Sequence, residues 1–224
     1  MKLLEELGLS KEQISKFEKY LGLLLEWNEK FNLTAITDKD EIEEKHFYDS
    51  IKLKDFFILK NKSLIDIGSG AGFPGIPLAI VEPSLQVTLL EATGKRVTFL
   101  KEVVSKLGLT NVEIIQGRAE ELETRENYDI VTARAVKELN VLLEISFYLV
   151  KVGGSFIAYK SSLVDEEINN AKHAFKCLEI DNYKKYDYSL PKSKNPRVFL
   201  EILKKKNTPK KYPRRYGEIS KSPL

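Results

Sequence analysis

The sequence predicts an α/β fold, in which a mostly parallel seven-stranded sheet carries helices on both faces and follows a helical N-terminal extension. Before Ser63, apolar residues recur at helical spacings, whereas after it short runs rich in Val, Ile and Leu alternate with helical stretches. The 224 residues are enough for one substantial core, though not for two equal domains. We therefore expect a single domain with three parts: a helical extension at 1–60, a core at 61–206 and a basic tail at 207–224.

The N-terminal extension opens with a helix start signal. Ser10 and Gln13 have the spacing of a capping box, in which each side chain bonds to the other residue's backbone N–H. The apolar residues from Ile14 to Phe31 then repeat every three or four positions, as on one buried helical face. A second helix is expected to start near Asp38 and to run through Ile51.

The core is predicted from alternating strand and helix patterns. Strands are expected at 63–67, 86–91, 112–116, 128–133, 154–160, 182–190 and 197–204, and helices at 75–81, 95–107, 138–149 and 164–177. No helical pattern separates the last two strands, so we expect them to pair antiparallel.

Several classes of protein are excluded by composition. No apolar run approaches the ~18 residues of a membrane span, and Glu5 and Glu6 interrupt the cationic start of a signal peptide, so we expect a cytoplasmic protein with no membrane partner. The single cysteine, Cys177, can form neither an internal disulfide nor a thiolate zinc cage. With only His46 and His173 besides, we expect no metal site.

The net charge of +3 conceals an uneven distribution. Residues 204–224 hold eight Lys and Arg against one acid, so this end carries +7 and residues 1–203 carry −4. Within this end, Lys210, Lys211, Arg214 and Arg215 are interleaved with tyrosines, a composition that favours contact with RNA. The alternative is a frayed terminus kept soluble by its charge.

A glycine-rich segment follows the first predicted strand directly. Glycines between Asp66 and Gly75 allow a tight turn and a close approach of a ligand to the main chain at the carboxyl edge of the sheet. Gly70, Gly72 and Gly75 satisfy the dinucleotide pattern G-x-G-x-x-G, and Glu91 lies where a carboxylate can accept the hydroxyls of a ribose. A nucleoside pocket is predicted, and a dinucleotide-dependent oxidoreductase is one alternative.

Charge favours a different ligand. Asp66, Glu91 and Glu120 are expected around one pocket, and three carboxylates repel a pyrophosphate but attract the sulfonium and ammonium of S-adenosyl-L-methionine. We therefore expect S-adenosyl-L-methionine as cofactor. The alternative is that Asp66 and Glu120 only cap helices or form surface pairs.

The glycine segment, read from Asp66 to Leu78 as DIGSGAGFPGIPL, resembles the first motif of the bacterial ribosomal RNA small-subunit methyltransferase G family, also called glucose-inhibited division protein B. Further stretches agree in order along nearly the whole chain: Asn32–Thr34, His46 with Asp49–Ser50, Gly94–Leu100, Gly117–Glu120, Ala133–Val136 and Lys210–Arg214. The resemblance implies a class I, Rossmann-like methyltransferase fold. It also implies methyl transfer from S-adenosyl-L-methionine to N7 of a guanine in 16S rRNA.

The resemblance also implies which residues contact the cofactor: Gly68, Phe73, Glu91, Ala92, Thr93, Ala119, Glu120 and Arg134. Family members commonly have Asp-Ser-Leu where this chain has Glu91-Ala92-Thr93, so a hydroxyl is lost and the carboxylate arm is longer. Arg134 is expected to face the ligand crevice and to contact the cofactor or the O6 atom of the base, with a salt bridge to Glu138 as the alternative. His46 and Asp49 are expected to share a structural hydrogen bond.

No general base is expected, because N7 of guanine has a free lone pair and loses no proton on alkylation. We assign no catalytic residue; alignment and exclusion of water are expected to suffice. The chain is expected to act as a monomer on 16S rRNA within the small subunit or an assembly intermediate, and a noncatalytic RNA-binding assembly factor is a further alternative. Removal of residues 208–224 is expected to spare cofactor affinity and to weaken RNA binding.

Overall fold

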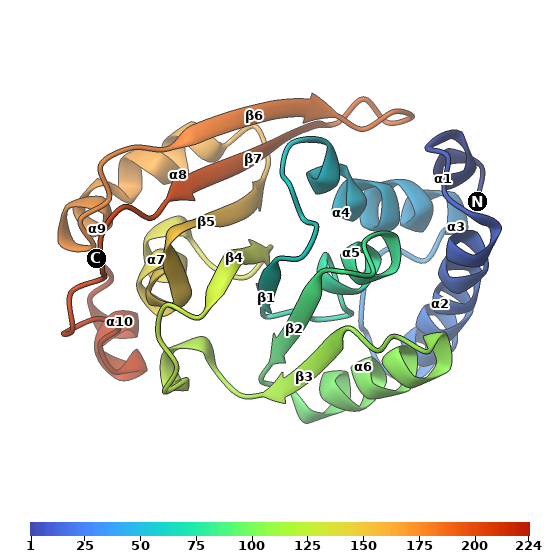
Figure 1. The fold of residues 1–224 in the computed structure, drawn as a ribbon, viewed down its shortest axis with the longest axis horizontal. Helices are drawn as coiled ribbons and strands as arrows, with labels where there is room; N and C mark the ends of the chain where they lie inside the picture. The colour runs from blue at the N-terminus through green and yellow to red at the C-terminus, as the bar shows by residue number, and fades with distance from the viewer.

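A computed structural model describes residues 1–224, the whole chain, and is built on one seven-stranded sheet (Figure 1). Its strands are β1 (Ser63–Ile67), β2 (Gln86–Glu91), β3 (Val112–Gln116), β4 (Tyr128–Arg134), β5 (Val150–Lys160), β6 (Lys184–Ser189) and β7 (Pro196–Leu203). They lie in the order β3-β2-β1-β4-β5-β7-β6. The first five strands of this order pair parallel with one another, and β7 pairs antiparallel with both β5 and β6. The predicted fold class is confirmed.

Helices cover both faces of the sheet and create two hydrophobic cores. One core joins β1 and β2 to α5 (Gly75–Val81), α6 (Gly94–Leu107) and the N-terminal helices. The other joins β4 and β5 to α7 (Leu139–Ser146), α8 (Val164–Asn170) and α9 (Lys172–Cys177). Because parallel strands bury both faces, the sheet needs a helical layer on each side.

The N-terminal extension is helical, as predicted, and packs into the first core. It contains α1 (Lys2–Glu6), α2 (Lys11–Lys30), α3 (Lys39–Ile42), the π-helical stretch η1 (Glu43–Tyr48), α4 (Asp49–Ile51) and the 3₁₀ turn η2 (Lys52–Asp55). Both hydrogen bonds of the Ser10–Gln13 capping box form, at 3.0 and 3.2 Å. Phe17 and Tyr20 of α2 are fully buried. None of the helices is long and apolar enough to cross a membrane.

Three predicted elements of the core differ most from the structure. β5 begins at Val150, four residues early, because its first residues pair with β4 through a register shift. The helix expected at 138–149 ends at Ser146 and continues as the 3₁₀ turn η4 (Phe147–Leu149). The helix expected at 164–177 is divided at Ala171, whose side chain is fully buried in the second core.

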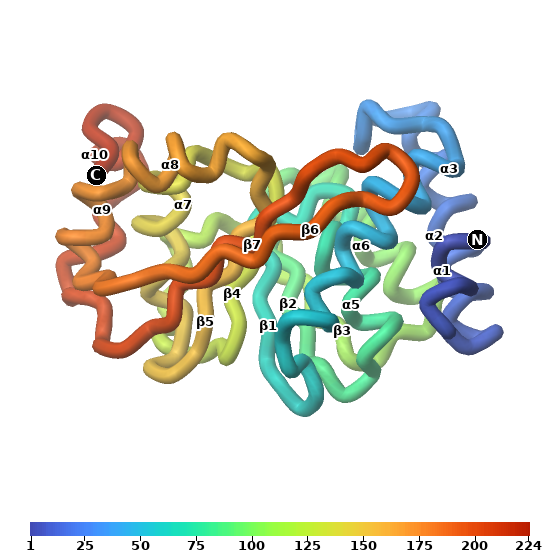
Figure 2. The backbone as a smooth tube through the Cα atoms, turned by 90° about the horizontal axis from the view of Figure 1, so that it is seen from above, coloured from blue at the N-terminus to red at the C-terminus, as the bar shows by residue number.

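Residues 207–224, expected from the sequence as the basic tail of a single domain, are packed against the rest of the fold. Arg125 donates to the carbonyls of Thr208 and Tyr212, and the helix α10 (Tyr216–Lys221) buries Ile219 completely in the second core. Asn140 donates to the carbonyl of Leu224 at 2.9 Å. Apolar residues interleaved with the basic ones anchor this C-terminal segment, which lies at the opposite end of the molecule from the N-terminus (Figure 2).

Candidate functional site

The glycine loop between β1 and α5 requires glycine at several positions. Gly68, Gly70 and Gly72 have φ values of 65°, 60° and 95°, a region that residues with a Cβ atom rarely adopt. A Cβ atom on Gly72 would lie 2.6 Å from the Tyr20 hydroxyl oxygen, and one on Gly68 would lie 3.1 Å from Val136. The loop is therefore tightly folded between the N-terminal helices and the segment after β4.

Glu91, the last residue of β2, fastens the loop to the neighbouring strand. Its Oε2 accepts from the backbone N–H of Gly70 at 2.9 Å, and its Oε1 accepts from that of Thr93 at 2.8 Å. The side chain is only 5% exposed. A buried carboxylate with two backbone donors is held rigidly at the carboxyl edge of the sheet.

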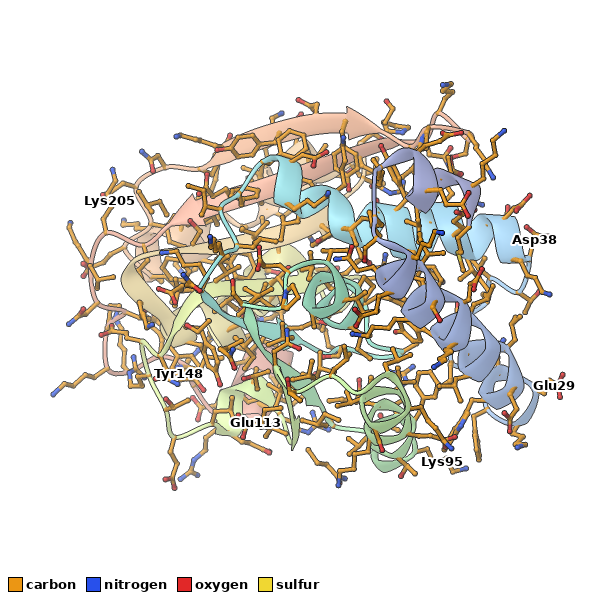
Figure 3. The ribbon with its side chains drawn as sticks, turned by 45° about the vertical axis from the view of Figure 1, so that its right-hand side comes forward. Glu29, Asp38, Lys95, Glu113, Tyr148 and Lys205 are labelled. Atoms are coloured by element: carbon orange, nitrogen blue, oxygen red, sulfur yellow. The ribbon has the colours of Figure 1, made fainter.

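A cavity of about 250 Å³ opens beside this loop, at the ends of β1, β2 and β3. Five of the eight predicted cofactor residues line it: Gly68, Glu91, Ala92, Ala119 and Glu120. Figure 3 labels Tyr148, whose hydroxyl lies 2.5 Å from the carbonyl of Ala119 and supports the 3₁₀ turn η3 (Ala119–Glu121). The structure thus brings together predicted residues from three separate segments. We call this the first cavity.

The acidic lining differs from the prediction. Glu120 lines the first cavity, and its Oε1 atom is buried without a hydrogen-bond partner. Asp66 does not line it: its Oδ2 accepts from the N–H of Gly75 at 3.0 Å, so the helix-capping alternative holds for this residue. Burial, opposed by that hydrogen bond, raises the pKa of Asp66 to about 7. Two carboxylates rather than three therefore face the ligand.

Three predicted cofactor residues lie outside the first cavity. The ring of Phe73 is buried and stacks on His46, with centroids 4.6 Å apart, because the loop turns it toward α2. Thr93 is exposed at the start of α6 and contributes its backbone N–H to Glu91. Arg134 points toward the N-terminal helices. Conversely, Tyr216 of α10 lines the cavity although no sequence pattern indicated it as a cofactor residue.

Arg134 ends β4 and is held by residues far away in the sequence. Its Nη1 donates to Asp49 Oδ2 and to the Lys45 carbonyl, each at 3.2 Å, and its Nη2 donates to His46 Nδ1 at 3.2 Å. The alternative of a salt bridge to Glu138 is wrong, because the buried carboxylate of Asp49 is the partner. The π-helical stretch presents His46 beside Asp49, and such stretches often occur at functional sites.

His46 stays neutral in this arrangement. Burial and the neighbouring guanidinium of Arg134 lower the pKa of His46 to about 3. Because an arginine can only donate, His46 Nδ1 must accept, and Nε2 therefore carries the proton toward Thr34 Oγ1, 2.8 Å away. The hydrogen bond expected between His46 and Asp49 is absent; both bind Arg134 instead.

A second cavity, of about 590 Å³, adjoins the first. The two share Ala135 and Lys137, in the segment that follows β4. Its lining includes Arg134, His46 and Asp49, and also Lys160 at the end of β5. The edge of the sheet thus carries two neighbouring cavities. The carboxylates of Glu91 and Glu120 line the smaller one together with Arg96, Arg118 and Lys137, and the larger one is rich in cations.

Comparison with known proteins identifies the family. The model of the family GidB, described as rRNA small subunit methyltransferase G, matches residues 13–193. The chain belongs to this family. A relative from Bacillus pumilus named ribosomal RNA small subunit methyltransferase G is 48% identical over 99% of this chain and 95% of its own. One of the same name from Lachnoclostridium phytofermentans is 46% identical, over 97% and 92%.

Solved structures share the fold of this rRNA small subunit methyltransferase G family member. A SAM-dependent methyltransferase from Aquifex aeolicus aligns with a TM-score of 0.57 at 18% identity, over 74% of this chain and 94% of its own. A precorrin-6y C5,15-methyltransferase from Geobacter metallireducens aligns with a TM-score of 0.54 at 16% identity, over 70% and 87%. The class I methyltransferase fold implied by the resemblance is confirmed.

Proposed function

We propose that the protein transfers a methyl group from S-adenosyl-L-methionine to N7 of a guanine in 16S rRNA. The observation that carries this proposal is the pairing of the first cavity, at the strand ends beside the glycine loop, with the larger cationic cavity next to it, in a chain of this family. The buried carboxylates of Glu91 and Glu120 suit the donor groups of the cofactor, and the second cavity suits an RNA nucleotide.

The residues of the first cavity fit S-adenosyl-L-methionine. The Oε1 atom of Glu120 is buried and accepts no hydrogen bond, although the Arg118 guanidinium lies 3.9 Å away, so it can accept from a ligand donor such as the amino group of adenine. Glu91 supplies a carboxylate at the edge of β2 where ribose hydroxyls can donate, although its longer arm is already bound to Gly70 and Thr93. We propose Gly68, Glu91, Ala92, Ala119 and Glu120 as direct contacts, with Thr93 and Phe73 supporting the loop and β2 from outside.

The same contacts disfavour a dinucleotide. A pyrophosphate is bound by free backbone N–H groups of the glycine loop and of the following helix start. Here the N–H of Gly70 donates to Glu91 and the N–H of Gly75 donates to Asp66. The donors that a pyrophosphate needs are occupied by carboxylates, which supports S-adenosyl-L-methionine over the oxidoreductase alternative.

The reaction requires alignment of the guanine with the methyl donor and requires no proton transfer. S-adenosyl-L-methionine, when bound, supplies a methyl group on a cationic sulfur that N7 of guanine can attack with its lone pair. The chain's task is to hold the base in line with that methyl group and to exclude water. Lys137 lies at the boundary of the two cavities and Arg134 lines the second one, where we propose that this alignment is set.

RNA contact by the C-terminal segment is proposed for fewer residues than the sequence indicates. Arg214 is engaged by the buried carboxylate of Glu144, with its Nε 2.6 Å from Oε1. Lys210, Lys211 and Arg215 are exposed and stay candidates for contact with phosphates.

Methylation of small subunits from a strain lacking the enzyme tests the proposal. Labelled S-adenosyl-L-methionine should place label on N7 of a guanine of 16S rRNA. Label on protein or on cytosine contradicts the guanine assignment, and absence of label supports the noncatalytic assembly factor. Calorimetry with S-adenosylhomocysteine and NADH separates the cofactors: tight binding of NADH alone favours the oxidoreductase.

A further inference from the structure

The second cavity is a local excess of positive charge in an otherwise acidic body. Five cations line it, namely Lys45, Arg134, Lys137, Lys160 and Arg197, against the three carboxylates of Asp49, Glu138 and Glu167. The cavity therefore has a formal charge of +2, whereas residues 1–203 together carry −4. Such a concentration of cations within an acidic part of the chain points to an anionic ligand.

Arg134 has hydrogen-bond donors to spare in this cavity. A guanidinium has five N–H donors, and three of them are used on Asp49, His46 and the Lys45 carbonyl. One Nη2–H and the Nε–H have no acceptor within the protein. Because its protein partners hold the guanidinium on one side, and its side chain is only 15% exposed, the unused donors are held in a fixed direction.

The carboxylate of Asp49 is saturated and cannot neutralise every nearby cation. It accepts from Arg134, from the Tyr188 hydroxyl at 2.8 Å, and lies 3.4 Å from Arg197 Nε. Two arginines thus share one negative charge. Lys160 is paired with Glu167, so it adds no net charge of its own.

Lys137 connects the two cavities. It is exposed, lines both of them, and forms no ion pair; its ammonium lies 5.9 Å from the centre of the Tyr216 ring. A cation at the boundary between a methyl-donor cavity and its neighbour is placed to contact a phosphate without competing against a carboxylate.

We propose that the second cavity receives the acceptor nucleotide, with Arg134 donating to O6 of the guanine and with Arg197 and Lys137 facing its phosphate. This inference rests on the proposed function. An arginine side chain, which can only donate, can hydrogen-bond to the oxygen at position 6 of guanine. It cannot hydrogen-bond to adenine there, because adenine has an amino group at that position. His46 and Asp49 are then positioning residues, which act by holding Arg134.

The charge balance of the reaction agrees with this placement. The N7 lone pair forms the new N–C bond, the electrons of the S–CH₃ bond stay on sulfur, and no proton is released. The positive charge moves from the cofactor to the guanine, next to Arg134. The Asp49 carboxylate beside Arg134 offsets the repulsion that an unpaired arginine would exert on the cationic product.

Nucleotide binding to the whole chain saturated with S-adenosylhomocysteine tests the cavity directly. Titration with 5′-GMP and 5′-AMP should show about tenfold tighter binding of GMP, and Arg134→Gln should remove that preference. Arg197→Gln should weaken both nucleotides about equally, whereas Lys19→Gln, an exposed charge on α2, should change neither. Equal binding of both nucleotides by the unchanged protein, or no binding of GMP, overturns the proposal.

Methyl transfer to small subunits gives a second measurement. Arg197→Gln and Lys137→Gln should raise KM for the subunit about tenfold, and Arg197→Gln should leave the S-adenosylhomocysteine Kd within twofold. An Arg197→Gln effect on that Kd as large as the effect on KM overturns the separation of the two cavities. If the unchanged protein methylates no subunits, the proposed function fails, while GMP binding still decides whether the cavity takes a guanine nucleotide.

Discussion

Breaking the buried ion pair between α7 and the C-terminal segment should release that segment from the fold. Glu144 is 1% exposed and accepts from Arg214 Nε at 2.6 Å, from Nη2 at 2.7 Å and from its backbone N–H at 3.3 Å. Arg214→Met leaves the carboxylate buried without its counter-charge, which costs about 3–5 kcal/mol. For a chain of this length we expect Tm to fall by roughly 6–20 °C, at about 2–4 °C per kcal/mol.

The effect should be a property of the pair rather than of either residue. In the double variant Glu144→Met with Arg214→Met, two apolar side chains of similar volume meet, and most of the lost stability should return. Urea unfolding gives the free energies, and limited proteolysis at the lysines of residues 204–211 reports release of the segment. An Arg214→Met protein that stays within about 1 kcal/mol of the unchanged protein and resists protease equally would refute this reasoning.

Three further outcomes are expected. Gly75→Ala should lower the free energy of unfolding by about 2–3 kcal/mol, because a Cβ atom would lie 2.3 Å from Leu89, whereas Gly217→Ala, with open space, should be neutral or stabilising in the same urea titration. The sequence alone led to the expectation that removal of residues 208–224 spares cofactor affinity. Because Tyr216 lines the first cavity, the structure instead predicts that this removal weakens S-adenosylhomocysteine binding in calorimetry at least tenfold; unchanged affinity would contradict this. The pKa of Asp66 rises from 3.8 to about 7 on folding. The stability that its protonated form contributes is therefore complete below pH 3.8 and is lost as pH rises through 7. Relative to Asp66→Asn, the free energy of unfolding of the unchanged protein should fall by about 3–4 kcal/mol between pH 4 and pH 8.

Local patterns predicted the fold well because the sheet is built from short repeated units. The capping box at Ser10, the change of period at Ser63 and the antiparallel final pair all form as expected. Departures occur where a distant contact decides the local conformation. The π-helical stretch at 43–48 is an example: it presents His46 and Asp49 to Arg134, which lies 85 residues or more further along the chain.

The candidate site was predictable where the backbone itself forms it. Gly68, Ala92 and Ala119 lie at strand ends, and parallel strands place those ends together. Side-chain partners were less predictable. Sequence proximity offered Glu138 as an alternative partner for Arg134, yet the partner is Asp49. Asp66 was expected to face a ligand, yet it accepts from the N–H of Gly75. A buried charge takes the nearest partner in space, which a single sequence does not show.

The C-terminal segment shows why a sum of charges is a poor guide to a binding surface. Of the +7 carried by residues 204–224, Arg214 is held by Glu144, and the fully buried Lys204 lies 3.3 Å from Glu126. Both cations are paired with carboxylates within the fold and are therefore not free to contact RNA. The second cavity has a smaller formal charge, +2, but its Lys137 forms no ion pair and lies at the boundary with the first cavity. Because unpaired cations release counterions from RNA when they bind it, we expect Lys137 to contribute more to RNA binding than either Arg214 or Lys204.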